Sequence, residues 1–203
     1  MLSRTQVING SLQIISANLI ADPDEDTESA RQARAIYDQI VGAEVEAHAW
    51  YFAKKQASLP ANAEAPPFKF KYAYNLPSDF ARLVEFNQNW VFSTIRYVDS
   101  NPVPPYEMVG RAIYTNVAAP LNITYLTNSV VADPTLWSAL FGNVASAALA
   151  VRLAMPLTKS EGMVSLAEKV HQKELARARK SNAIQMPPAY PPDGSWMTAR
   201  VLV

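Results

Sequence analysis

The sequence predicts an α+β protein: a helical bundle formed from N- and C-terminal helices, with an inserted aromatic-rich antiparallel β lobe and an extended C-terminal arm. Apolar residues recur at helical spacing near both ends of the 203-residue chain. Fifteen of the twenty aromatic residues and eight of the fifteen prolines lie between Trp50 and Tyr125, a composition typical of strands and turns. Four prolines in residues 187–192 exclude a helix there. We therefore expect a bundle of residues 1–50 and 131–182, a β-rich lobe of residues 51–130 and an arm of residues 183–203.

The helix expected at residues 133–156 is the best marked element. Asp133 is a favourable cap, Pro134 suits the first helical position, and Pro156 predicts the end. The residues between are apolar on nearly every side, as in a buried helix. Its length approaches a membrane span, but four polar residues interrupt the apolar run: Ser138, Asn143, Ser146 and Arg152. We therefore expect the central helix of a soluble bundle.

Two helices are expected before residue 50. Ser3 and Gln6 form a capping-box pattern, followed at roughly helical spacing by Val7, Ile8, Leu12, Ile15 and Leu19. Five carboxylates between Asp22 and Glu28 then precede the pattern Ala30, Ala33, Tyr37, Ile40 and Val41, where acidic residues favour the helix dipole. A calcium loop starting at Asp22 would require Gly at position 27 and Glu at position 33. The sequence has Thr27 and Ala33, which favours a solvated helix start.

Six strands are expected in the central region. Their ranges are 50–59, 69–75, 82–87, 92–98, 106–114 and 121–127. Residues 68–72 alternate aromatic and lysine side chains, which is typical of a half-buried strand. Prolines 66–67 and 102–105 mark loops.

A last helix is expected to run from a capping box of Thr158 and Glu161 to about Asn182. One stripe is apolar, with His171 on it: Val164, Ala167, His171, Leu175 and Ala178. The basic run Lys169–Lys180 has no interleaved aromatic residues, so we interpret it as a solvated face. It could also pair with the acidic residues 22–28 of a neighbouring copy.

The residue types present argue against most catalytic and cofactor chemistry. Eighteen basic and eighteen acidic residues cancel, so no strong overall field favours nucleic acid or an anionic membrane. Cysteine is absent, and the six glycines are at least twenty residues apart, which excludes thiolate chemistry and a glycine-rich phosphate loop. No local motif joins the two histidines, His48 and His171. We predict no enzyme activity, no catalytic residue, no cofactor and no metal site. The N-terminal residues lack a continuous apolar core, so synthesis in the cytosol is expected.

The C-terminal arm supplies the candidate functional residues. An extended, proline-rich segment cannot bury its own large side chains. Tyr190, Trp196 and Met197 are therefore expected to dock elsewhere, together with Arg200, as interface anchors.

Six passages, in order, carry a resemblance to a known family. They are Leu19–Asp26 leading into the alanine-rich helix, His48–Ala53 (HAWYFA), Tyr74–Asp79 (YNLPSD), Leu121–Tyr125 (LNITY), Ala150–Ala154 (AVRLA), and Gly194–Trp196 followed by Ala199–Arg200. Together they resemble the tail tubular protein A, or head-to-tail adaptor, family of short-tailed bacteriophages. Residues 88–107 carry no part of the resemblance.

The resemblance implies a structural protein of the virion, made in the host cytoplasm and located at the head–tail junction. It implies a homo-oligomeric ring of twelve copies that docks under the portal protein and receives the tail tube or nozzle protein. The genome would cross the lumen with transient, non-specific contacts and no membrane is involved. The balanced charge suits a channel that DNA leaves quickly. Two alternatives stay open: a tail-completion or stopper protein of a long-tailed phage, and a hydrolase whose residues meet only in three dimensions.

Overall fold

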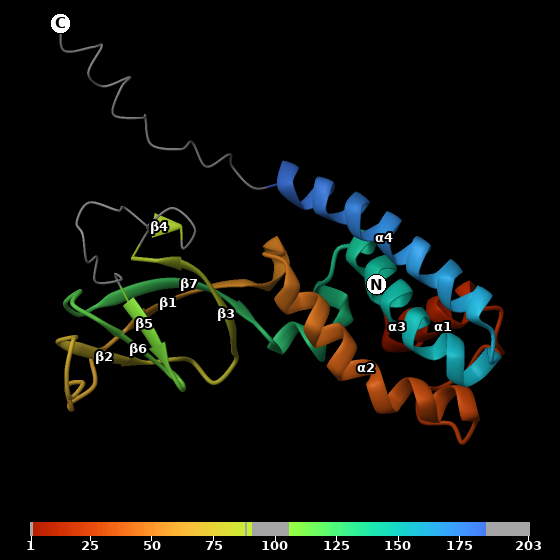
Figure 1. Cartoon of the computed structure of the whole chain (residues 1–203), viewed down its shortest axis with the longest axis horizontal. Coiled ribbons are helices and arrows are strands. Elements are labelled where there is room, and N and C mark those ends of the chain that lie inside the picture. Colours follow the sequence, from red (N-terminus) through yellow and green to blue (C-terminus); the bar gives the residue numbers. More distant parts are fainter. Residues whose placement is uncertain (1, 88, 91–105, 186–203) are drawn as a thin grey trace, which may run out of the picture.

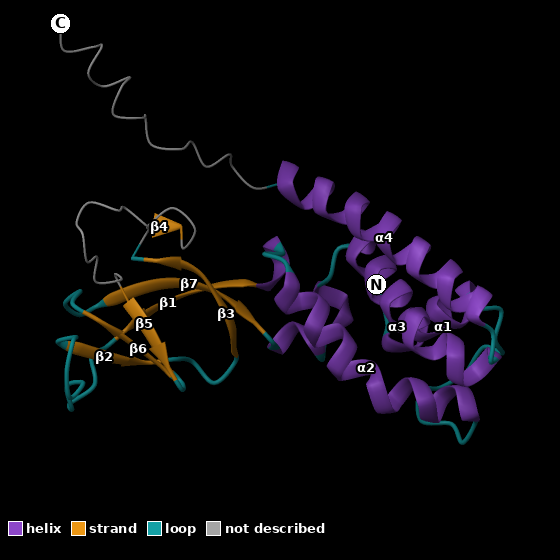
Figure 2. Cartoon of the chain, viewed as in Figure 1, coloured by secondary structure: helices purple, strands orange, loops and turns teal. Residues whose placement is uncertain are grey.

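The computed structural model describes residues 2–87, 89–90 and 106–185 and confirms the α+β class, with helices and two antiparallel sheets (Figures 1 and 2). The helices are α1 (Arg4–Ile14), α2 (Glu28–Ala47), α3 (Ala139–Thr158) and α4 (Glu161–Ile184). The strands are β1 (Lys54–Leu59), β2 (Tyr72–Asn75), β3 (Phe80–Phe86), β4 (Asn89–Trp90), β5 (Tyr106–Val109), β6 (Ala112–Thr115) and β7 (Leu121–Thr127). Three short 3₁₀ turns, η1 (Tyr51–Ala53), η2 (Ser129–Val131) and η3 (Pro134–Leu136), link them.

Helix α3 lies at the centre of the helices, in contact with α1, α2 and α4 (Figure 1). Eleven of its residues are buried, among them Phe141, Val144, Leu149 and Leu153. It is long and apolar enough to cross a membrane by length and composition, and about half of that apolar stretch is buried inside this fold. The packing is that expected of a core helix.

Both predicted ends of α3 are wrong. Asp133 caps the short turn η3 instead, and the helix begins after Ser138, whose hydroxyl accepts the Phe141 amide at 3.2 Å. Pro156 lies inside the last turn, and the helix continues to Thr158. Proline removes the hydrogen bond to the Arg152 carbonyl, but both residues are exposed, and the helix tolerates Pro156 in its last turn.

Helix α1 begins at its predicted capping box and packs on α3. The predicted capping box is confirmed, with Ser3 and Gln6 exchanging hydrogen bonds of 2.9 and 3.2 Å. Leu19, expected on the α1 stripe, lies beyond the helix end and is 54% exposed.

Where α1 crosses α3, the Ser146 hydroxyl donates to the Val7 carbonyl at 2.9 Å, and a Cβ on Gly10 would lie 2.7 Å from that hydroxyl oxygen. Glycine therefore permits this crossing.

Replacing Gly10 by alanine should destabilise the protein by about 1–2 kcal/mol, because overpacking outweighs the better helix propensity of alanine. Urea unfolding followed by tryptophan fluorescence measures the change. Gly42→Ala in α2 is the matched control, since a Cβ there meets nothing within 4 Å. It should stabilise the protein by up to about 1 kcal/mol. Equal signs for the two variants would contradict the close crossing.

Two of the five carboxylates of the acidic segment before α2 form ion pairs within the chain. Asp26 pairs with Arg31 at 2.6 Å and Asp24 with Arg34 at 3.3 Å. Glu25 accepts the Ala21 amide and the Thr27 hydroxyl, and these hydrogen bonds, the Ala21 one first, lower its pKa. Thr27 is the α2 cap. The expected pairing of this segment with a neighbour's basic helix stays a prediction, and these carboxylates already have partners.

The predicted capping box of α4 is wrong. Ser160 caps the helix by accepting the Met163 amide, while the Thr158 hydroxyl donates to the Ala154 carbonyl at 2.6 Å, within α3. Lys159 lies between the helices in a left-handed conformation, with φ 51°. Two residues with similar capping propensity compete here, and the tight α3–α4 turn selects the second.

The strands form two antiparallel sheets, in the orders β1-β7-β3-β4 and β2-β6-β5. The inner faces of both sheets share one core: Leu59, Tyr74, Leu83, Phe86, Ile113, Leu121, Ile123 and Tyr125. At its other end the four-stranded sheet packs on the helical core through Val84 and Leu126. The sheets and helices therefore meet at the first residues of β1.

Several predicted strands required correction. Only β7, residues 121–127, has the predicted bounds, and β3 is shifted to residues 80–86. Residues 50–53 form a turn before β1, and the range 69–75 shortens to β2, because Lys69 has a positive φ of 71° and Phe68 is exposed. The range 106–114 is a hairpin, β5–β6, that turns at Gly110 with φ 59°. The strand predicted at residues 92–98 lies outside the described residues.

Candidate functional site: the junction of helices and sheet

The last turn of α4 is attached to the α2–β1 link through one side chain, Asn182. Asn182 is 3% exposed. Its Oδ1 accepts the Tyr51 amide at 2.9 Å, and its Nδ2 donates to the Ala49 carbonyl at 3.0 Å and lies 3.2 Å from His48 Nε2. Because this amide is fully used, the end of α4 is fixed on residues 48–51. The chain after residue 185 starts from this point (Figure 1).

His48 acts as a packed hydrogen-bond acceptor at this junction. It is the C-cap of α2 and contacts the Trp50 ring edge to face, with centroids 4.8 Å apart. Burial lowers its pKa first, and the positive charges of Arg179, Arg82 and Lys54 lower it further. The nearby Asn182 Nδ2 is a donor, so His48 Nε2 accepts. The neutral ring thus agrees with the predicted structural role of His48.

Aromatic rings form a rigid base under the junction. The Trp50 Nε1 donates to the Glu44 carbonyl at 2.8 Å, and the Trp50 ring lies 5.0 Å from the ring of Phe141 in α3. Phe52 and Trp137 contact the same Phe141 ring at 5.0 and 5.1 Å. Aromatic pairs of this kind each contribute about 0.5–1.5 kcal/mol beyond the area that they bury. The residue passage 48–53, singled out in the sequence, therefore forms the joint between helices and sheet.

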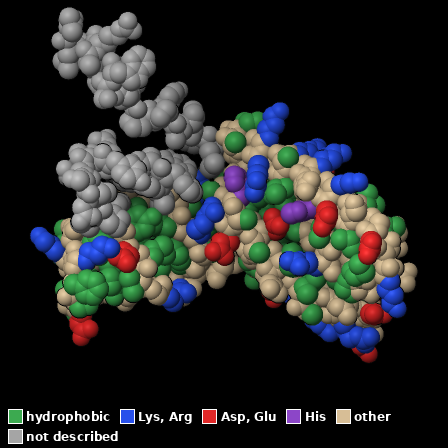
Figure 3. Space-filling model, viewed as in Figure 1, with side chains coloured by type: hydrophobic (Ala, Val, Ile, Leu, Met, Phe, Trp, Pro, Cys, Tyr) green, Lys and Arg blue, Asp and Glu red, His purple; other side chains and the backbone are tan. Residues whose placement is uncertain are grey.

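Apolar side chains are exposed around this rigid base. Tyr51 is 40% exposed and Ile184 is 78% exposed, and both lie within two residues of the Asn182 hydrogen bonds. Basic side chains gather on the same face, near the histidines (Figure 3).

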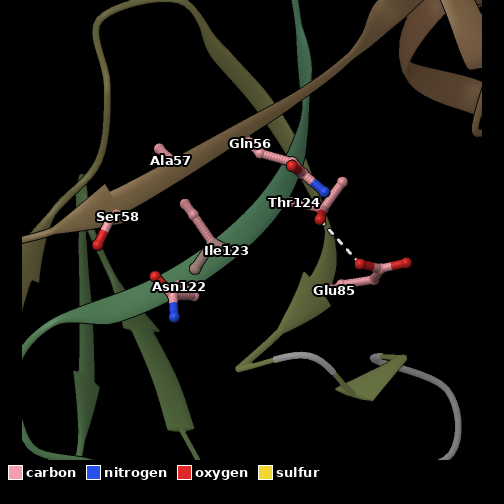
Figure 4. A pocket seen from close by; sticks show the side chains of 7 residues that line it. All are labelled: Gln56, Ala57, Ser58, Glu85, Asn122, Ile123 and Thr124. Carbon is pink, nitrogen blue, oxygen red and sulfur yellow. Dashed lines mark hydrogen bonds between the residues drawn. The ribbon is translucent and has the colours of Figure 1, made fainter.

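A groove lined by polar side chains and by Ala57 and Ile123 crosses the four-stranded sheet (Figure 4). Gln56 and Ser58 of β1, Asn122 and Thr124 of β7 and Glu85 of β3 line it, with a volume of about 420 Å³. Thr124 pairs in register with both Gln56 and Glu85, and its hydroxyl donates to Glu85 Oε2 at 2.8 Å. We call this feature the sheet groove. It holds one carboxylate, so it does not supply the carboxylate pair that glycoside hydrolysis uses.

The remaining sequence candidates divide into two groups. Tyr190, Trp196, Met197 and Arg200 lie outside the described residues. His171 lies between α4 and α2, with Nε2 3.0 Å from Glu44 Oε1, and is partly exposed instead of being a core residue. Asn182 was not predicted, although it continues the inner stripe four residues after Ala178. Within the described residues no group of three His, Asp or Glu side chains is placed to hold a metal ion.

No protein-family model matches this sequence, and a search of curated proteins gives no significant match.

Proposed function

We propose that this chain is a head-to-tail adaptor of a short-tailed bacteriophage: a structural subunit of a ring between the portal and the next tail protein, with DNA crossing the lumen. Part of the support is where the passages that resemble this family lie. The 48–53 passage forms the junction, and the 74–79 passage holds Asp79, which directly precedes β3 and binds side chains of β1 and β7. The 150–154 passage lies in the central helix. The residues of each passage contact elements that are distant in the sequence. A shared fold would restrict the choice of amino acid at such contacts.

The observation that carries the proposal is the rigid starting point of the C-terminal segment. Asn182 fixes the end of α4 on residues 48–51, and Tyr51 and Ile184 are exposed beside it. Residues 187–203 follow, with prolines for stiffness and with Tyr190, Trp196 and Met197 as apolar anchors. An arm held rigidly at its base loses less conformational entropy when its far end docks. This arrangement suits a subunit that grips a neighbouring chain.

The finer organisation belongs to the same proposal. Residues 1–50 and 131–182 form the bundle that packs side by side in the ring, residues 51–130 form the aromatic-rich lobe, and residues 183–203 form the arm that reaches a neighbouring subunit or the portal. Twelve copies follow from the resemblance alone.

Removing residues 187–203 tests the proposal. Light scattering and native mass measurement, with and without the portal of the same phage, should show a ring for the full chain and none for the shortened chain. The shortened chain should keep the circular dichroism and unfolding temperature of the full chain, because the buried residues of both hydrophobic cores lie between Val7 and Ala178. Full-affinity assembly of the shortened chain on the portal would overturn the proposal.

A point variant sharpens the same test. Trp196→Ala should weaken ring formation at least tenfold, since a buried tryptophan at an interface is commonly worth more than about 2 kcal/mol. Phe68→Ala is the control, because Phe68 is an exposed aromatic residue outside the arm. Equal loss in both variants would show that the arm has no special role.

A further inference from the structure

One side of α4 carries a row of positive charges. Its members are all exposed: Lys169, Lys173, Arg177 and Lys180. At about 100° of rotation per helical residue, the four positions fall within an arc of about 80° and span about 16 Å along the helix axis. Figure 3 shows Lys and Arg side chains gathered along α4. We call these four residues the α4 cation row.

The row faces away from the rest of the subunit. The opposite side of α4 contacts α3 and carries the buried residues of the helix, which are Ala167, Ala178 and Asn182. A helix with one buried side presents its other side outward. The cation row is therefore free to meet a molecule outside the subunit.

The positive charges of the row are largely uncompensated. Among the residues that the structure describes, the row makes one ion pair, from Arg177 to Glu174 at 4.0 Å, and the Lys169, Lys173 and Lys180 ammonium groups have no partner. The exposed side chains from residue 169 to residue 180 include five cations and no carboxylate. Like charges this close repel one another. Because the whole chain has no net charge, this positive excess is local, and it favours an anionic partner.

The composition of this surface favours nucleic acid over protein as that partner. Besides the cations, the exposed residues between 169 and 180 are only Gln172 and Ala176. Protein interfaces are depleted in lysine and depend on aromatic or apolar anchors, which this stretch lacks. The DNA backbone, in contrast, is bound mainly through Lys and Arg, whatever its sequence. The row therefore matches a line of phosphates better than it matches another polypeptide.

We propose that the α4 cation row contacts the phosphates of duplex DNA, and that α4 lines the lumen of the ring. This inference rests on the proposed function, in which DNA crosses that lumen, and it names the surface that meets the DNA. Contacts made only to phosphates carry no sequence information and weaken as salt rises. They suit a duplex that must move past the subunit.

Fluorescence anisotropy with a labelled duplex of about 30 base pairs tests the contact. The full chain is titrated into the duplex between about 20 and 150 mM NaCl, and the binding constant per subunit is measured at each concentration. If each of the four cations neutralises one phosphate, log K should fall against log [NaCl] with a slope of about −3.6. Duplexes of unrelated sequence should bind equally.

Two matched double variants separate the row from the net charge. Lys169→Gln with Lys173→Gln removes two charges from the row, so the slope should become shallower by about 1.8. Lys71→Gln with Lys159→Gln removes two charges from exposed lysines outside the row and should leave the slope unchanged. Because all four lysines are exposed, both variants should keep the unfolding temperature of the natural chain.

Lysine acetylation followed by mass spectrometry tests the placement. Excess duplex should protect Lys169, Lys173 and Lys180 of the full chain from the reagent, while Lys71 should react to the same extent with and without DNA. Protection of Lys71 equal to that of the row would show that DNA has no preference for α4 and would overturn the inference.

Three further outcomes would also overturn it, and each differs from failure of the proposed function. They are no binding of the duplex at the lowest salt, an equal change of slope in the two double variants, and a row variant that binds the duplex normally but no longer assembles on the portal. The last outcome would assign the row to a neighbouring protein, as in the predicted pairing with residues 22–28. Full assembly of the chain without residues 187–203 would instead overturn the adaptor proposal and leave the DNA measurements unchanged.

Discussion

Replacing Asn182 by alanine should lower the free energy of unfolding by about 2–4 kcal/mol. The substitution removes three hydrogen bonds of a side chain that is 3% exposed, and it leaves the Tyr51 amide, the Ala49 carbonyl and His48 Nε2 without this partner. Each buried polar group left unsatisfied costs about 1–3 kcal/mol. Urea unfolding at neutral pH, followed by tryptophan fluorescence, measures the loss.

Two further variants separate the hydrogen bonds from the cavity. Asn182→Leu fills a similar volume but satisfies neither backbone group, so it should remain destabilising by at least about 1 kcal/mol. Asn116→Ala is the matched control, because Asn116 is exposed and accepts one hydrogen bond, from the Lys71 amide at 3.1 Å. It should cost less than about 1 kcal/mol. A leucine variant as stable as the natural chain would show that the Asn182 hydrogen bonds contribute nothing net.

Local sequence signals predicted much of the secondary structure. The Ser3–Gln6 capping box, the inner residues of α2 and the bounds of β7 follow from adjacent residues alone. Competing local signals gave the errors. Two helix starts compete before α3: one is Asp133 with Pro134, and the other is Ser138. Trp137 is extended between them, with its Nε1 donating to the Val130 carbonyl, so the first start gives only a short turn.

The junction could not be predicted in the same way, because its contacts join distant residues. Asn182 lies more than 130 residues from Ala49 and Tyr51. One available signal was an asparagine on the inner stripe of an otherwise apolar helix face, since such a residue needs a buried partner. The sheet groove likewise depends on strand register, which places Gln56 and Glu85 on either side of Thr124.

The second large effect is expected at Asp79, which holds three strands together. Its carboxylate, next to β3, accepts Lys55 Nζ of β1 at 2.7 Å and two hydroxyls of β7, Tyr125 at 3.0 Å and Thr127 at 2.8 Å. Tyr125 and Thr127 are buried. Asp79→Ala should therefore destabilise the protein by about 2–4 kcal/mol, because it removes the hydrogen bond of the buried Tyr125 hydroxyl and leaves Lys55 without its carboxylate, while Thr127 keeps its contact with the Ser129 hydroxyl.

The same contacts make stability depend on pH. The hydrogen bond from Lys55 is the main cause that lowers the pKa of Asp79 from 3.8 to about 2, with smaller contributions from Thr127 and Tyr125. A pKa lowered in the folded state stabilises the protein above pH 3.8, and this stabilisation is lost as the pH falls from 3.8 toward 2. Because the side chain is partly exposed, we expect a contribution of about 1–2 kcal/mol.

Unfolding free energies measured at pH 6 and at pH 2.5 separate this contribution from the rest. Asp79→Asn should be less stable than the natural chain at pH 6, and the difference should shrink by about 1 kcal/mol at pH 2.5. At that pH the Asp79 carboxyl of the unfolded chain is protonated, so ionising it on folding releases a proton against the acidic solution and most of the stabilisation is lost. Lys55→Gln keeps the Tyr125 and Thr127 hydrogen bonds but removes the main cause of the pKa shift, so it should flatten the same part of the profile. An Asp79→Asn profile as steep as that of the natural chain between these pH values would assign the acid sensitivity to other carboxylates.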